Sequence, residues 1–293
     1  MLFRSVRLRI TSVNSTSQIT SAMKMVSAAK LKRAQDAITT MRPYANKLKE
    51  ILENVSSGLG SAESVFSQKP KQEKNILIVA ISSNRGLAGA FNANIIKRTN
   101  QLIKGDFSGK NVSVVCIGKK VADAFRRSPV FYSGTDIPSD LNKLFDALTF
   151  DNVRPVAESI MNAFKQGKFD KIVLVYNQFK NAAVQVTLTE QFLPVSAEGS
   201  STTTKTSVDY IFSPDVEFIV SDLIPRSLKT QLFKALLDSN AAEHGARMTA
   251  MHKATDNAKE MLRELRLTYN KARQAAITKE ILEIVAGAEA LNG

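Results

Sequence analysis

The sequence predicts an α/β protein in which a folded domain is inserted between two long terminal helices. Both ends of the chain carry apolar or small residues in alternating steps of three and four, which is the pattern of a helix packed against another helix. The middle of the chain instead alternates short apolar strands with helices. Two seams that flank an insert predict an antiparallel pair. We therefore expect an N-terminal coiled-coil helix at 1–58, an α/β domain at 73–215 and a C-terminal coiled-coil helix at 216–293.

The sequence from about Val6 to Val55 is compatible with one long helix, apart from Pro43. The seam continues in register past this proline, so we expect a kink rather than a helix end. The predicted seam residues are Leu31, Ala34, Ile38, Met41, Ala45, Leu48, Leu52 and Val55, preceded by Ile19, Met23 and Val26 after a slip in register.

The C-terminal helix has no glycine or proline between Ala246 and Ala286. Forty helical residues make a rod of about 60 Å, which is longer than a small domain is wide. Residues near the chain start should pack beside residues near its end, for example Val26 near Ala275. The predicted seam residues are Met251, Ala254, Ala258, Met261, Leu265, Thr268, Ala272 and Ala275.

The insert is predicted to be Rossmann-like, with a mostly parallel sheet and helices on its faces. Short apolar runs indicate strands, and the segments between them are suited to helices. Strands are expected at 75–81, 112–117, 171–176, 183–195 and 207–212, and helices at 90–104, 119–127, 139–149 and 152–166.

The net charge and the cysteine content limit which partners and which kinds of site are expected. The net charge is +13, and residues 1–60 hold ten Lys/Arg against three Asp/Glu. Such an excess predicts an anionic partner, whether nucleic acid, acidic lipid or an acidic protein surface. Cys116 is the one cysteine, so a disulfide within the chain and a cysteine zinc cluster are excluded. Its apolar run favours a buried, inert thiol over a reactive one.

The segment at 82–92, SSNRGLAGAFN, follows a strand and opens a helix, where phosphates often bind. It lacks the lysine and hydroxyl of a P-loop and does not match GxGxxG. Gly86 and Gly89 are better explained by a tight turn and close helix–sheet packing. The two histidines, His244 and His252, favour neither a hydrolytic triad nor a metal site. We expect no catalytic residue, cofactor or metal.

Three blocks together resemble the gamma subunit of F-type ATP synthases. They are RITSVNSTSQITSAMKMVSAAKLKRAQ at 9–35, SSNRGLAGAFNANI at 82–95, and the segment from EHGARM to GAEAL at 243–291. They occur in family order with the α/β insert in place, so the resemblance covers nearly the whole chain. Coiled-coil packing alone would not require the polar residues of the first and third blocks.

The resemblance implies a rotating central shaft with no active site of its own. In that family the paired helices stand inside a hexamer of alpha and beta subunits, and the insert is a foot that contacts the epsilon subunit and the ring of c subunits. Proton flow turns the ring and the shaft, and each orientation of the shaft favours different states of the beta subunits, giving ATP synthesis or, in reverse, hydrolysis. One copy per complex is implied, with membrane association only through the complex.

The resemblance also implies site residues. Position by position, the residues that match the family's coupling contacts with the beta subunit are Met23, Lys24, Arg247, Gln274, Thr278 and Glu280. Helix solvation or seam packing is the alternative role for each, and for Met23 the two are evenly balanced. Tyr210 matches an aromatic residue near the contact of the foot with the epsilon subunit and the c-ring.

Two other functions compete with this interpretation. A basic coiled-coil nucleic-acid-binding protein would explain the charge but not the shared polar residues, and we do not expect nucleic acid as a partner. A nucleotide-dependent enzyme built on 73–215 would need the missing phosphate motif. The cytoplasmic face of a bacterial plasma membrane is favoured over the matrix side of the mitochondrial inner membrane, because a helical pattern begins too early for a presequence.

Overall fold

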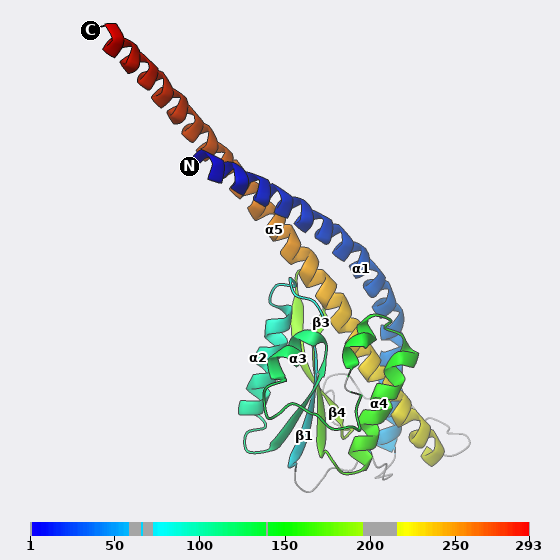
Figure 1. Cartoon of the computed structure of the whole chain (residues 1–293). Coiled ribbons are helices and arrows are strands. Elements are labelled where there is room, and N and C mark those ends of the chain that lie inside the picture. The colour runs from blue at the N-terminus through cyan, green and yellow to red at the C-terminus, as the bar shows by residue number, and fades with distance from the viewer. Residues whose placement is uncertain (1, 59–65, 67–72, 139, 196–215, 293) are drawn as a thin grey trace. The chain divides into compact units, whose positions relative to one another are not determined.

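The computed structural model describes residues 2–58, 66, 73–138, 140–195 and 216–292 (Figure 1). Two compact units are present, one formed by residues 1–28 with 247–293 and the other by residues 29–246. The long helices α1 (Leu2–Gly58) and α5 (Val216–Asn292) each contribute to both units.

The centre of residues 29–246 is a four-stranded mixed sheet in the order β2-β1-β3-β4. The first three strands are parallel and β4 is antiparallel to β3, so the predicted mostly parallel sheet is confirmed. The predicted strand at 207–212 lies outside the described residues. The strands are β1 (Asn75–Ile81), β2 (Asn111–Ile117), β3 (Lys171–Phe179) and β4 (Gln185–Leu193).

Helices cover both faces of this sheet, because alternate side chains of the buried strands point to opposite faces. Ile76, Ile78 and Val173 pack with α2 (Phe91–Lys104) and α3 (Lys119–Phe125). Leu77, Val79 and Leu174 pack with α4 (Phe150–Lys165) and with the first part of α5. Where the sequence predicted helix at 139–149, a short 3-10 helix spans Leu141–Phe145.

The N-terminal seam is confirmed over its middle portion. Its residues are buried at Leu31, Ala34, Ile38, Ala45 and Leu48, and Met41 is half-buried. The side chains at the predicted positions 52 and 55 lie outside the described residues. Helix α1 continues through Pro43, as expected, since a proline inside a helix removes one hydrogen bond without removing the packing that holds both flanks.

The seams of the other unit differ from the prediction at alternate positions. In α1, Ile19 and Val26 are exposed, and the buried positions among the described side chains of this unit are Val6 and the hydroxyl residues Ser17 and Ser27. In α5, the predicted Met251, Ala254, Ala258, Leu265 and Ala272 are buried or half-buried. The predicted Met261, Thr268 and Ala275 are exposed, and Thr255, Leu262 and Tyr269 are also buried or half-buried. The predicted period was therefore right, and the buried face differs from the prediction by one residue at Leu262 and Tyr269, which are covered where Met261 and Thr268 were expected.

Ser and Thr can occupy buried positions between the helices because their side chains are small. Their hydroxyl groups can also hydrogen-bond to a carbonyl of their own helix. Ser27 donates to the carbonyl of Met23 at 2.7 Å, four residues earlier on its own helix. The Thr255 and Thr20 hydroxyl oxygens lie 2.8 Å apart across the pair. No slip in α1 is therefore needed. The two helices lie side by side and antiparallel here (Figure 1).

The last part of α5 extends as a single helix past the start of α1 (Figure 1). Every side chain from Arg273 to Ala290 is exposed. These include an apolar stripe whose members recur at helical spacing, namely Ile277, Ile281, Leu282, Ile284 and Val285. We call residues 273–290 the α5 extension.

Candidate functional site

The loop at 82–92 is occupied by its own polar contacts. The Asn92 side-chain oxygen accepts from the Ser83 backbone N–H at 3.0 Å and from the Ser83 hydroxyl at 2.9 Å. Asn84 donates to the Asn142 carbonyl at 2.8 Å and accepts from the Lys119 backbone N–H at 3.1 Å. These groups fasten the loop to α2, to α3 and to the 3-10 helix. They favour the packing role over a phosphate site.

Close packing also explains a glycine next to this loop. Gly118 has φ = 106°, and a Cβ atom there would lie 2.2 Å from the Ser82 carbonyl oxygen. The end of β1 and the start of α3 approach too closely for any other residue. Within the loop, Leu87 and Gly89 both have positive φ, so a tight turn is present where the sequence predicted one.

Three of the predicted coupling residues lie within the paired part of the helices. Met23 and Lys24 of α1 are half-buried, and Arg247 of α5 is only 8% exposed. Because Arg247 is mostly covered by this chain, any contact with another subunit is restricted to a small part of its side chain.

The other three predicted residues lie on the α5 extension and are fully accessible. Gln274 and Thr278 are one turn apart, and the Thr278 hydroxyl donates to the Gln274 carbonyl at 2.9 Å. At about 100° per residue, Glu280 lies on nearly the opposite side of the helix from Thr278. The structure thus brings Gln274 and Thr278 together and separates Glu280 from them. Tyr210 lies outside the described residues.

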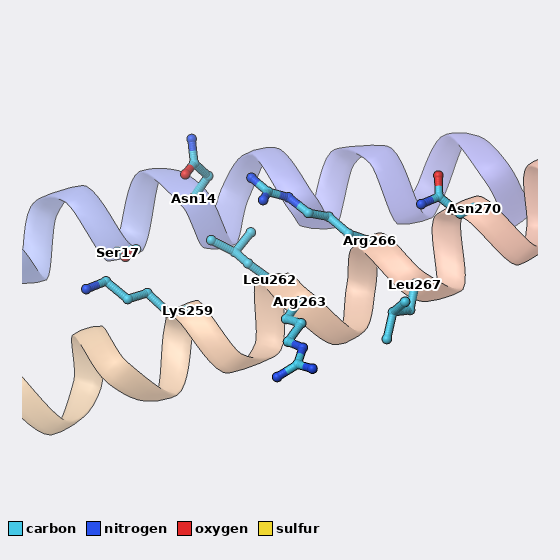
Figure 2. Close-up of a pocket in the computed structure, with 8 residues that line it drawn as sticks. All are labelled: Asn14, Ser17, Lys259, Leu262, Arg263, Arg266, Leu267 and Asn270. Atoms are coloured by element: carbon cyan, nitrogen blue, oxygen red, sulfur yellow. The ribbon is translucent and has the colours of Figure 1, made fainter.

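A basic groove between α1 and α5 was missed by the sequence reasoning. Figure 2 shows Leu262 of α5 pointing toward α1, with charged side chains on either side. The groove has a volume of about 460 Å³ and is lined by Asn14, Ser17, Lys259, Leu262, Arg263, Arg266, Leu267 and Asn270. The spacing of Lys259, Arg263 and Arg266 at i, i+4 and i+7 was a signal that could have found it. The three cations make this stretch of the pair suited to an acidic surface.

An ion pair whose carboxylate is buried and whose guanidinium is partly exposed joins the two helices to the sheet. The Arg42 guanidinium of α1 lies 2.9 Å from a carboxylate oxygen of Asp238 on α5, and it also donates to the Phe179 carbonyl of β3 at 2.9 Å. The Asp238 side chain is fully buried, and burial raises its pKa above the ordinary value although Arg42 opposes this shift. These residues are up to 196 positions apart in the chain, so no local pattern could reveal the pair.

Among the residues that the structure describes, no helix contains an apolar stretch long enough to cross a membrane.

Comparison with known proteins identifies the family. The family model described as ATP synthase matches residues 3–291. The chain is 55% identical over 290 residues to the ATP synthase gamma chain of Christiangramia forsetii and 57% identical over 292 residues to that of Flavobacterium psychrophilum, covering 99% of each chain in both comparisons.

Solved structures share the fold. In the Euglena gracilis mitochondrial ATP synthase structure of OSCP, F1 and c-ring, a chain with 20% identity aligns at a TM-score of 0.71, over 99% of this chain and 94% of that one. In the central stalk and c-ring of the Tetrahymena thermophila enzyme, a chain with 23% identity aligns at a TM-score of 0.57, over 80% of this chain and 99% of that one. With its two long paired helices, its inserted mixed sheet and its full-length relatives in bacteria, the chain belongs to the ATP synthase gamma chain family, which forms the central stalk of the F-type enzyme.

Proposed function

We propose that this chain is the shaft that couples proton-driven rotation of a membrane c-ring to the conformational cycle of catalytic beta subunits. ATP synthesis follows in one direction and ATP hydrolysis in the other. Its gamma-chain relatives and the rotor structures that share its fold support this proposal.

The observation that carries the proposal is the α5 extension. A lone helix of this length is marginally stable in water, and here its apolar stripe is exposed as well. A partner that encloses the helix on all sides would bury the stripe and stabilise it. A ring of alpha and beta subunits is such a partner, and a smooth sleeve would let the helix turn within it.

The positions of Gln274, Thr278 and Glu280 fit a partner that surrounds the helix. Because Glu280 faces away from the other two, one flat partner could not contact all three at once. Within a ring, opposite sides of the helix would face different subunits, and turning the helix would exchange these contacts. Each hydrogen bond contributes about 0.5–1.5 kcal/mol, or about 1.5–3 kcal/mol when one group is charged. Together they could favour one ring conformation by a few kcal/mol.

Met23, Lys24 and Arg247 are proposed as further beta-subunit contacts, and the basic groove would meet an acidic part of the ring. The α/β domain and Tyr210 are proposed to contact the epsilon subunit and the c-ring. The complex would hold the chain at the cytoplasmic face of a bacterial plasma membrane. The two gamma chains of high sequence identity named above are bacterial.

A single-molecule experiment tests the proposal. The hexamer of the matching alpha and beta subunits is fixed to a surface with this chain bound. A bead is attached through a cysteine at the exposed Lys97 in a chain that carries Cys116→Ala. ATP should rotate the bead continuously in one direction. Brownian motion alone, with ATP hydrolysis intact, would refute the shaft function.

The coupling residues have a separate test in vesicles that contain the whole complex. The triple change of Gln274, Thr278 and Glu280 to Ala should lower proton-driven ATP synthesis per complex while leaving assembly intact. The control changes three exposed polar residues of the α/β domain, Asn94, Gln101 and Asp106, to Ala. Equal synthesis by the triple variant and the control would show that the three residues are only solvated helix surface.

Lys165 and Lys168 are less suitable as controls because both make contacts in the fold. The Lys165 ammonium lies 4.8 Å from the centre of the Phe66 ring, and Lys168 forms an ion pair with Asp136.

A further inference from the structure

Helix α5 contacts the sheet through two polar ties that lie on one face of the helix. Gln231 and Asp238 are seven residues apart, which is nearly two full turns, so both side chains project in the same direction. The ties are about 10 Å apart along the helix axis. Apolar residues of the same stretch of α5 also pack in the core, among them Leu228, Leu232 and Leu236.

The first tie is the Arg42–Asp238 pair with the Phe179 carbonyl. It joins three elements, because Arg42 belongs to α1, Asp238 to α5 and Phe179 to the end of β3. One guanidinium nitrogen contacts both acceptors at 2.9 Å. A change in the rotation of either helix about its axis would break at least one of these contacts.

The second tie is built around Glu190 of β4. One carboxylate oxygen accepts from the Gln231 side chain at 2.8 Å, and the other accepts from the buried Tyr176 hydroxyl at 2.8 Å. Gln231 also donates to the Gln191 carbonyl at 3.1 Å. The helix is thereby joined to two neighbouring strands.

The surroundings of Asp238 do not suggest that the first tie serves mainly to stabilise the fold. Its side chain is fully buried, and its Oδ2 atom has no hydrogen-bond partner. The Arg42 side chain is 39% exposed, so only the Asp238 end of the pair is buried. Ion pairs that bury a carboxylate contribute little net stability compared with apolar residues of similar volume. They do impose one geometry, because hydrogen bonds are directional while apolar contacts between leucines tolerate sliding.

We propose that the two polar ties fix the rotational position of α5 and α1 against the sheet and so carry torque between the α/β domain and the shaft helices. Arg42, Asp238, Gln231 and Glu190 are then positioning residues for coupling. This inference rests on the proposed shaft function.

The test replaces the first tie with apolar residues, Arg42→Met together with Asp238→Leu, in the complete complex. The bead assay described above is run with the hexamer held in one nucleotide state. The bead's thermal fluctuations then report the torsional stiffness of the chain. Because one of two directional ties is lost, stiffness should fall about two-fold. The melting temperature should change little, and protons pumped per ATP should decrease.

The matched control makes the same substitutions at an exposed pair on α5, Arg226→Met with Asp222→Leu, whose charged groups lie 3.5 Å apart on neighbouring turns of the helix. This control should keep the wild-type stiffness. Wild-type stiffness and pumping in the R42M/D238L variant would overturn the inference, while failure of the wild-type bead to rotate with ATP would overturn the shaft function instead. If R42M/D238L does not assemble, Asp238→Asn decides: reduced stiffness in an assembled complex supports the inference, and loss of assembly again assigns the tie a purely structural role.

Discussion

A disulfide between the two helices should form at Thr20 and Thr255, whose hydroxyl oxygens lie 2.8 Å apart. We expect the double change Thr20→Cys and Thr255→Cys to cross-link readily in a chain that carries Cys116→Ala, because the two new sulfur atoms would replace atoms already in contact. This disulfide would join the two chain ends across a separation of 235 residues.

The expected magnitude follows from the size of the closed loop. Restricting an unfolded chain by a loop of this length stabilises the folded state by about 5 kcal/mol in the chain-entropy treatment. Loss of the threonine hydrogen bond removes about 1 kcal/mol. The net gain of about 4 kcal/mol corresponds to a rise in melting temperature of roughly 7 °C for a chain of this size.

The assay compares the oxidised and reduced forms of the same variant by non-reducing electrophoresis and by thermal melting. The pair Val26 and Ala275, which the sequence suggested, serves as the negative control. From the Thr20–Thr255 contact these two positions lie in opposite directions along the helices, about 40 Å apart. Absence of the Thr20–Thr255 cross-link, or equal melting of both forms, would refute the antiparallel pairing deduced here.

Three further outcomes are expected within residues 29–246. Cys116 is half-buried rather than buried, and desolvation raises its thiol pKa from 9.0 to about 12, so alkylation at pH 8 should be about a thousandfold slower in the folded chain than in urea; equal rates would contradict this. Leu232 of α5 is fully buried against the sheet, so Leu232→Ala should lower the free energy of unfolding by about 2–5 kcal/mol in denaturant titrations, and a loss below 1 kcal/mol would argue against that packing. Hydrogen bonds from Lys110 and Lys171 lower the pKa of Glu73 below 4.5, so its charge stabilises the fold above that pH and this contribution is lost as pH falls through the lowered pKa. Acid titrations should show that Glu73→Gln is less stable than wild type near pH 7 and equal to it in strong acid; a constant difference would exclude this linkage.

Local patterns accounted for much of the fold. The strands at 75–81, 111–117 and 171–179 are rich in apolar residues, and the helices between them have one apolar face. Their formation depends on residues within a few positions of one another, so periodicity is sufficient to predict them. The same holds for the alternating steps of three and four in α1 and α5.

The face of the helix pair was not predictable from apolarity. Met261 and Val26 look like seam residues, yet they are exposed, while Ser17, Ser27 and Thr255 are buried. From sequence alone a serine or threonine is expected at the surface. It is small, however, and its hydroxyl can donate a hydrogen bond to its own helix, so it fits where two backbones come close. Which face is closest depends on the partner helix.

Some features of the candidate site could be found from the sequence, and others required the tertiary structure. Resemblance to a family supplied Gln274, Thr278 and Glu280, and helix geometry alone shows that Glu280 faces away from the other two. The basic groove and the pairing of Arg42 with Asp238 depend on segments far apart in the chain. By itself, the sequence determined the periods of the helices and strands and the residue types at the family's positions, because these are local properties. The tertiary structure decided which faces meet and which buried charges pair, because those outcomes depend on contacts between residues that only folding brings together.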